Sequence, residues 1–317
     1  MTPDLDVVAG VVQAAMGSPR RAVAVERLRG GTKKGVHRIT LDDGSSAILY
    51  VWGATETYWP DDAASAAFTV ADGIKPFAAA HSALTAAGVR VPAVHLLDAS
   101  RTRYPSDVAV VEDVRGGTLE GLIERDPDAA RGVVALLGGV LRLMREHRST
   151  RFGALTAELR DPPAGAVVLD GLLRDITFAA AQVPPLRDAE ARLVDVGHRL
   201  AAEIRPRDDV GLVHGELGPD HVLIDDSGRP VLIDIEGLTF FDVEREHVFL
   251  RLRFGEELYR LLAVDGLDPA RLRLYRLAMH VSLVAGPLLL LRGGFPDRAF
   301  LEMLVRQHTA ATLTFTR

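Results

Sequence analysis

The chain has 317 residues, of which 48% are hydrophobic and 25% are charged, and its formal net charge is −6 at pH 7. This length suits two lobes or one large core, and the mildly acidic charge argues against nucleic acid as the main partner. The sequence contains no cysteine, which excludes disulfides and cysteine-based zinc sites.

Short strand-like runs and one helix make up the first 114 residues. The expected strands are residues 21–29, 36–41, 47–52, 89–97 and 108–114. The glycine-rich segment GGTKKG (30–35) follows the first strand, and a DDGS turn at 42–45 joins the second to the third. The helix covers residues 74–87 and stops at Gly88, as helices often do.

Beyond residue 117 the spacing of the apolar residues is helical. Helices are expected at residues 118–126, 130–147 and 188–204. A strand-rich first third followed by a helical remainder predicts an α+β fold with two lobes, residues 1–114 and 115–317. The cleft between two lobes is the usual place for a ligand.

The most apolar stretch of the chain is VSLVAGPLLLL at residues 281–291, which contains Gly286 and Pro287 and ends at Arg292. Because a membrane helix needs about 18 or more uninterrupted apolar residues, we expect a buried helix here and no membrane association. The N-terminal sequence MTPDLDVVAG lacks the basic segment of a secretory signal. We therefore expect a cytoplasmic protein.

Two apolar strands flank a tight turn in LVHGELGPDHVLIDDSGRPVLIDIEG, residues 212–237. The strands are residues 222–224 and 231–233, and Asp-Ser-Gly-Arg is a strong turn signal. Folding the hairpin brings His221 next to Asp234, with Glu216 in the preceding loop. Since a carboxylate at the end of a buried strand must be paired or metal-bound, Asp234 is the strongest functional candidate.

This string resembles the aminoglycoside phosphotransferases, small-molecule kinases related to protein kinases. The family carries His-Gly-Asp, then Asn five residues after that Asp, then a hairpin and Ile-Asp. Here the equivalents are His-Gly-Glu at 214–216, His221 and Asp234. The resemblance implies a protein-kinase-like fold with a small antiparallel sheet in the N-lobe and a helical C-lobe. It also implies that Glu216 is the catalytic base, with His214 beside it, and that His221 and Asp234 hold metal.

The resemblance covers roughly residues 20–260 and extends to nucleotide binding. It implies a glycine-rich loop over the phosphates of ATP or GTP, and a strand end whose backbone holds the base. The implied nucleotide-binding residues are Gly30, Gly31, Lys33, Lys34, Gly35, Glu112 and Val114. The implied metal is Mg²⁺, and the nitrogen ligand that His221 would supply makes Mn²⁺ a second candidate.

Three positions depart from the family pattern. Glu216 replaces Asp and moves the carboxylate outward by about one methylene, and His221 replaces Asn. Tyr50 stands where the family usually has the Lys or Arg that binds the α- and β-phosphates, and residues 74–87 contain no Glu to pair with such a cation. We expect Lys33 and Lys34, in the glycine-rich loop, to supply the missing charge.

The acidic residues after the hairpin have a different predicted role. Asp242 and Glu246 lie four residues apart on an expected helix, in the acidic positions of the family's Gly-Asp-Pro-x-x-Asp segment. Arginines flank them in the sequence, and we expect both to be paired structurally.

Three functions compete at this point. The first is a nucleoside-triphosphate-dependent kinase that phosphorylates a hydroxyl of a small molecule, an antibiotic or a metabolite. The second is a kinase-like protein that binds nucleotide or metabolite without transfer, which the three departures favour. The third is a metal-dependent hydrolase using His214, Glu216, His221 and Asp225, although this spacing is not that of a helical zinc motif.

Overall fold

The structure is a computed structural model that describes residues 2–17, 19–28, 31–60, 72–161 and 163–317. Contacts divide the chain into two compact units. The first comprises residues 1–58, 71–136 and 219–236, and the second comprises residues 59–70, 137–218 and 237–317. Each unit thus combines segments that are distant in the sequence, and the lobe division at residues 114 and 115 stays a prediction.

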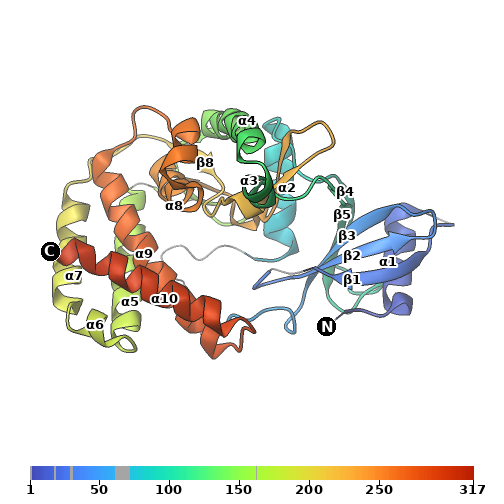
Figure 1. Ribbon diagram of the computed structural model, residues 1–317, viewed down its shortest axis with the longest axis horizontal. Coiled ribbons are helices and arrows are strands. Elements are labelled where there is room, and N and C mark those ends of the chain that lie inside the picture. Colours follow the sequence, from blue (N-terminus) through green and yellow to red (C-terminus); the bar gives the residue numbers. More distant parts are fainter. Residues whose placement is uncertain (1, 18, 29–30, 61–71, 162) are drawn as a thin grey trace. The chain divides into compact units, whose positions relative to one another are not determined.

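A five-stranded antiparallel sheet dominates the first unit (Figure 1). Its strands are, in spatial order, β1 (Ala22–Arg27), β2 (Gly35–Leu41), β3 (Ser46–Trp52), β5 (Asp107–Glu112) and β4 (Val94–Asp98). The strand expected at residues 89–97 begins only at Val94. Pro92 has no N–H for a ladder, and the carbonyl of Arg90 accepts a hydrogen bond from the N–H of Leu232 (3.0 Å).

The two faces of the sheet have different partners, because side chains alternate along a strand. Leu49 and Val51 of β3 face the helix α1 (Leu5–Met16) and pack with its buried Val8 and Val11. Tyr50, between them, points the other way and meets the helix α2 (Ile74–Ala86). The predicted helix at 74–87 is confirmed.

The predicted hairpin is also confirmed, and it belongs to the first unit. β9 (Val222–Ile224) pairs with β10 (Pro230–Leu232), one residue earlier in the second strand than expected. The short 3₁₀ helices Pro219–His221 and Ile235–Gly237 flank the pair. An isolated bridge from Leu223 to Thr118, the residue that caps α3 (Leu119–Arg125), joins the hairpin to the segment after β5.

Helices make up most of the second unit. α4 (Pro127–Glu146) begins among the residues of the first unit and ends among those of the second. The others are α5 (Ala164–Ala180), α6 (Pro184–Arg187), α7 (Glu190–Ala202), α8 (Val243–Leu262), α9 (Pro269–Arg292) and α10 (Arg298–Leu313), followed by the 3₁₀ turn Thr314–Thr316. A small sheet runs in the order β6 (Arg148–Ser149), β8 (Val210–Val213), β11 (Thr239–Phe241) and β7 (Gly153–Ala154). The helices predicted at 130–147 and 188–204 are confirmed.

Helix α9 forms the centre of the second unit. It packs against α5, α7, α8 and α10, and it buries the apolar residues Leu274, Leu277, Ala278, Val281, Val284 and Ala285. By length and composition it is the one helix in the described residues that would be able to cross a membrane, and 72% of its most apolar window is buried inside the structure. A core helix of a globular unit has the same properties, as the sequence predicts for residues 281–291.

A buried carboxylate organises the start of α8. Asp242 is 2% exposed and accepts hydrogen bonds from Arg271 (3.1 Å), Arg207 (3.2 Å) and the hydroxyl of Tyr275. The structural pairing predicted for Asp242 is therefore confirmed. Because these donors come from α9 and from the loop before β8, the carboxylate joins three segments of the second unit.

Two histidines meet between α9 and α10. The Nδ1 atoms of His280 and His308 lie 2.9 Å apart, so one ring donates its proton to the other. Burial lowers the pKa of each ring to about 4, and for His280 the neighbouring charges of His308 and Arg276 lower it further. In an unfolded chain the same rings take up protons near pH 6.5.

We therefore expect the free energy of unfolding to fall as the pH drops from 6.5 towards 4. In that range the unfolded chain binds more protons than the folded one, and above pH 6.5 the full stability is present. Urea unfolding at a series of pH values measures the slope. The slope should become shallower in His280→Asn and stay unchanged in His198→Ala, which removes an exposed histidine. Equal slopes in all three proteins would contradict this expectation.

Candidate active site

A cavity of about 530 Å³ opens in the first unit, next to the hairpin and the end of β5. This volume lies within the range of small-molecule sites. Apolar side chains form part of its lining: Leu28, Val36, Ile48, Val114, Leu223 and Ile233. Charged residues gather in another part of the lining, among them Lys34, Asp220, His221 and Asp234. The cavity therefore combines apolar walls with ionic groups, as a nucleotide requires.

The segment after β5 offers backbone atoms to a flat ring. Val114 lines the cavity, and in the described part of the chain no hydrogen bond uses its N–H. The neighbouring Asp113 carboxylate accepts from Arg38 (2.8 Å) and from Ser46 (2.6 Å), which fixes this segment to β2 and β3. The Glu112 carboxylate is held by Arg90 (2.5 Å), whose hydrogen bond lowers the pKa of that carboxyl.

Lys34 is the central cation of the cavity. Its ammonium group lies 2.7 Å from Oδ1 of Asp234 and 2.5 Å from Oε1 of Glu236, and its side chain is 8% exposed. Burial alone would lower the pKa of Lys34, but the two carboxylates outweigh it and raise the pKa above its ordinary value. Burial raises the pKa of the Glu236 carboxyl, against the attraction of Lys34. We regard the Lys34–Glu236 contact as ionic, because the lysine stays charged and touches the carboxylate directly.

Tyr50 occupies the middle of β3 and lines the same cavity. Its ring meets that of Phe77 from α2 edge to face at 5.6 Å, and the ammonium of Lys34 lies 4.9 Å from its centroid. Burial raises the pKa of the Tyr50 hydroxyl to about 12, so the ring is neutral beside the cation.

The two residues predicted to hold metal are neighbours, as the hairpin geometry predicts. Nε2 of His221 lies 3.7 Å from Oδ2 of Asp234, and 3.6 Å from Oδ2 of Asp220 on its other side. Asp234 has φ +57°, a left-handed conformation that is uncommon outside glycine and is often found at functional sites. One oxygen of Asp234 faces Lys34 and the other faces His221.

These donors fit a divalent ion that a nucleotide brings with it. In the part of the chain that the structure describes, no group of three or more histidine, aspartate or glutamate side chains is arranged to hold a metal by itself. A metal bound through one or two protein ligands completes its shell with phosphate oxygens and water. His221 and Asp234 would supply one nitrogen and one oxygen to such an ion.

The predicted catalytic residues belong to the second unit, in the loop after β8. His214 is 1% exposed, and Glu246 of α8 accepts the backbone N–H groups of His214 (2.5 Å) and Gly215 (3.2 Å). Gly215 has φ +90°, which a side chain would strain. Glu246 therefore fixes the shape of this loop, and its predicted structural pairing is confirmed.

Arg245 packs against the same loop. Its guanidinium group is buried, lies 5.1 Å from the ring centroid of Phe241, and is close enough to Gly215 that an added Cβ would come within 3.5 Å of it. Burial lowers the pKa of Arg245, while the charges of Glu216 and Glu246 oppose this. The half-buried Glu216 carboxylate therefore has a fixed positive charge as its neighbour.

Only part of the glycine-rich segment at residues 30–35 lines the cavity. Gly31 has φ +79° and lines the cavity with Lys34. Gly35 lies where an added Cβ would be 2.6 Å from Oε2 of Glu56, so a side chain there would displace that carboxylate. Neither Gly35 nor the half-buried Lys33 is among the lining residues. Gly30 lies outside the described residues, and nucleotide contacts of these three residues stay predictions.

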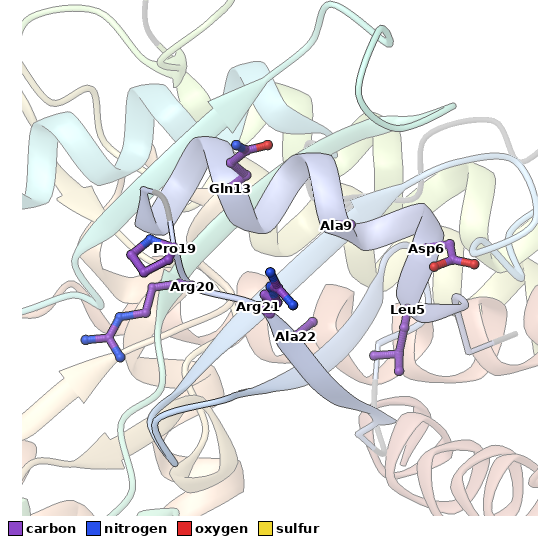
Figure 2. A pocket seen from close by; sticks show the side chains of 8 residues that line it. All are labelled: Leu5, Asp6, Ala9, Gln13, Pro19, Arg20, Arg21 and Ala22. Carbon is purple, nitrogen blue, oxygen red and sulfur yellow. The ribbon is translucent and has the colours of Figure 1, made fainter.

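A second hollow, of about 510 Å³, lies on the first unit between α1 and the start of β1. Figure 2 shows that its side chains come from α1 and from residues 19–22. Its polar groups are Asp6, Gln13 and the exposed Arg20 and Arg21, and Arg20 is already paired with Asp43. It lacks the buried, opposed charges of the first cavity, which is the better candidate.

Sequence reasoning missed Asp220, which lines the first cavity, and Glu236, which contacts the cavity's lysine. Glu236 follows the buried Ile235, so it is the kind of acid that must be paired, yet nothing in the sequence identified Lys34 as its partner. Asp220 precedes His221 and has no place in the family string. The hydrolase hypothesis loses one of its residues, because Asp225 accepts from Ser227 (2.6 Å) and closes the hairpin turn.

Comparisons with known proteins bear on the family and the fold of this chain. The pattern described as "Phosphotransferase enzyme family" matches residues 25–275. Among curated proteins no sequence match is found. A thermostable mutant of aminoglycoside phosphotransferase APH(4)-Ia, in a ternary complex with AMP-PNP and hygromycin B, has 17% sequence identity and a TM-score of 0.63, covering 96% of this chain and 98% of that chain.

Two further solved structures are similar over their whole length. Spectinomycin phosphotransferase APH(9)-Ia, in complex with ADP and spectinomycin, has 13% identity and a TM-score of 0.61, covering 97% of both chains. LicA in complex with AMP has 12% identity and a TM-score of 0.65, covering 98% of both chains. At these identities the likeness shows the fold alone: a protein-kinase-like α+β fold, as the sequence predicts.

The hydrogen bonds from the loop at 214–216 to Glu246 can be tested directly. Glu246→Ala leaves two buried N–H groups without their acceptor, and we expect it to lower the free energy of unfolding by about 2–4 kcal/mol. Urea denaturation measures the change. Glu257→Ala, which removes an exposed acid from the same helix, serves as the control and should change stability by less than about 0.5 kcal/mol. If Glu246→Ala lowers the free energy of unfolding no more than the control does, the hydrogen bonds to Glu246 do not stabilise the loop.

Proposed function

Because the chain belongs to the phosphotransferase enzyme family, we propose that it transfers the terminal phosphoryl group of a nucleoside triphosphate to a hydroxyl of a small molecule. The observation that carries this proposal is the position of Asp234. Its two carboxylate oxygens face Lys34 on one side and His221 on the other, in the lining of an apolar cavity. That arrangement offers a cation and a metal site to a polyphosphate at the same place.

The reaction needs few groups from the protein. The acceptor oxygen attacks the γ-phosphorus, the bond from that phosphorus to the β–γ bridging oxygen breaks, and the hydroxyl proton passes to the Glu216 carboxylate. The products are a nucleoside diphosphate and a phosphate monoester. Catalysis then consists of positioning and charge stabilisation. Arg245 supports Glu216 in this role, because a fixed guanidinium charge favours the ionised carboxylate that accepts the proton.

The nucleotide would lie with its base against the apolar wall and its phosphates at Lys34. Adenine is the base that suits the segment after β5, where the carbonyl of Glu112 accepts from the exocyclic amine and the N–H of Val114 donates to the ring. Complexes of related folds with ADP, AMP-PNP and AMP support ATP as the donor. When bound, the metal would neutralise the phosphates, held by Asp234 and His221.

The acceptor is a small molecule with a free hydroxyl. The related folds were solved with hygromycin B and spectinomycin, which supports an antibiotic or a metabolite of comparable polarity. Such substrates and ATP occur together in the cytoplasm, where we place the protein.

Two substitutions separate binding from transfer. Glu216→Gln keeps the size of the side chain but cannot take the proton, so we expect the turnover number to fall by about 10²–10⁴ with nucleotide affinity unchanged. Asp234→Asn should weaken binding of the metal–nucleotide complex and lower turnover together. Calorimetric titration with AMP-PNP measures nucleotide affinity, and an assay coupled to ADP release, run with and without each of a panel of hydroxyl compounds, measures turnover.

Asp225→Asn serves as the control, because that carboxylate closes the hairpin turn at the far end from Asp234. It should leave nucleotide affinity unchanged. If the wild-type protein binds AMP-PNP and transfers phosphate to no acceptor, the protein is a non-catalytic nucleotide binder and the transfer step proposed here is wrong.

The histidine ligand predicts a metal preference. Manganese tolerates nitrogen ligands better than magnesium does, so we expect the wild-type protein to bind AMP-PNP more tightly with Mn²⁺ than with Mg²⁺, by about tenfold. His221→Asn restores an oxygen ligand and should narrow this ratio towards one. Titration of each variant with AMP-PNP in either metal measures the ratio. An unchanged ratio would show that His221 does not touch the ion.

A further inference from the structure

The family's phosphate-binding cation is missing from its usual strand, and an aromatic contact stands in its place. In kinases a lysine on the third strand pairs with a glutamate of the following helix. In this protein Tyr50 of β3 meets Phe77 of α2 edge to face at 5.6 Å, and Trp52 packs against both rings. Strand and helix are therefore joined by apolar packing, and neither element carries the ion pair.

Lys34 reaches the same place from the loop that leads into the neighbouring strand, β2. The register pairs Val36 of β2 with Tyr50 of β3, so both side chains leave the same face of the sheet. Lys34 lies just before β2 and lines the same cavity as Val36 and Tyr50. Its ammonium lies over the Tyr50 ring, 4.9 Å from the ring centroid.

Glu236 provides the counter-charge that the helix lacks. It is 6% exposed, and its Oε1 lies 2.5 Å from the Lys34 ammonium. Asp234 contacts the same ammonium at 2.7 Å but keeps 43% of its side chain exposed. Glu236 is thus the buried anchor of the lysine, and Asp234 is the partner that can turn towards a ligand.

We propose that the ion pair which positions the nucleotide phosphates has been transposed in this protein, with Lys34 as the phosphate-binding cation and Glu236 as the residue that positions it. This inference rests on the proposed function and names the groups that carry it out. On nucleotide binding, Lys34 exchanges its contact with Asp234 for the α- and β-phosphates and keeps Glu236, which frees Asp234 for the metal.

The test compares ligands with and without phosphates. Adenosine and AMP-PNP share the base and the ribose, so their affinity ratio isolates what the phosphates contribute. Lys34→Met keeps the apolar stem and removes the charge. Because a charge-assisted hydrogen bond to phosphate is lost, we expect AMP-PNP to bind about tenfold or more weakly, with adenosine affinity changed by less than about twofold. Lys34→Arg should retain most of the preference for AMP-PNP.

Glu236→Gln tests the anchor. It should weaken AMP-PNP binding less than Lys34→Met does, and the double variant should be no weaker than Lys34→Met alone, because the two residues act as one unit. Lys75→Ala, which removes an exposed lysine of α2, is the matched control and should change neither affinity. Thermal unfolding of each variant verifies that it is folded.

The outcomes separate this inference from the proposed function. Equal losses of adenosine and AMP-PNP affinity in Lys34→Met would mean a merely structural lysine, and additive losses in the double variant would remove Glu236 from its role. A wild-type preference for AMP-PNP that Lys34→Met retains would overturn the transposition and leave the kinase proposal intact. Binding of neither ligand by the wild-type protein would overturn both.

Discussion

The first unit depends on a balance of buried charge. Glu236 is buried close to the partly exposed Asp234, so the two carboxylates repel each other and Glu236 also loses its hydration. A single ammonium group, that of Lys34, compensates both. Removing one partner of such a group leaves an uncompensated charge, which is why buried ion pairs are costly to break even where they add little net stability. The phosphates and metal of a bound nucleotide can replace the contact between Lys34 and Asp234, while the contact between Lys34 and Glu236 remains.

The same principle governs the loop that carries Glu216. Glu246 accepts hydrogen bonds from two backbone N–H groups there. The buried Arg245 lies next to Gly215, and the charges of Glu216 and Glu246 compensate its charge. Each unit thus holds one candidate site carboxylate, the partly exposed Asp234 or the half-buried Glu216, next to a buried counter-charge. Such a neighbouring charge attracts the carboxylate and helps to orient it.

The sequence predicted the parts of this structure that local rules determine. Alternation of apolar and polar residues specifies β2, and a continuous apolar run specifies β3. The Asp-Ser-Gly-Arg turn specifies the hairpin, and the hairpin alone brings His221 to Asp234. The pairing of Lys34 with Glu236 joins residues 202 positions apart and has no local signal. The strand expected from residue 89 failed at Pro92 for a similar reason, since the carbonyl of Arg90 is used by the distant Leu232. Long-range polar partners, unlike periodicity, depend on the completed fold.

The transposition of the lysine has a low energetic cost because of sheet geometry. Moving a cation from the third strand to the residue just before the second strand shifts it between neighbouring segments, and a four-carbon stem spans the remaining distance. The vacated position then has to be filled, and a bare cavity between β3 and α2 would cost packing energy. Tyr50 and Phe77 fill it, and the face of the tyrosine ring attracts the ammonium that has moved above it. The loss of the strand lysine and the appearance of the aromatic pair are therefore one change, in which each substitution makes the other tolerable.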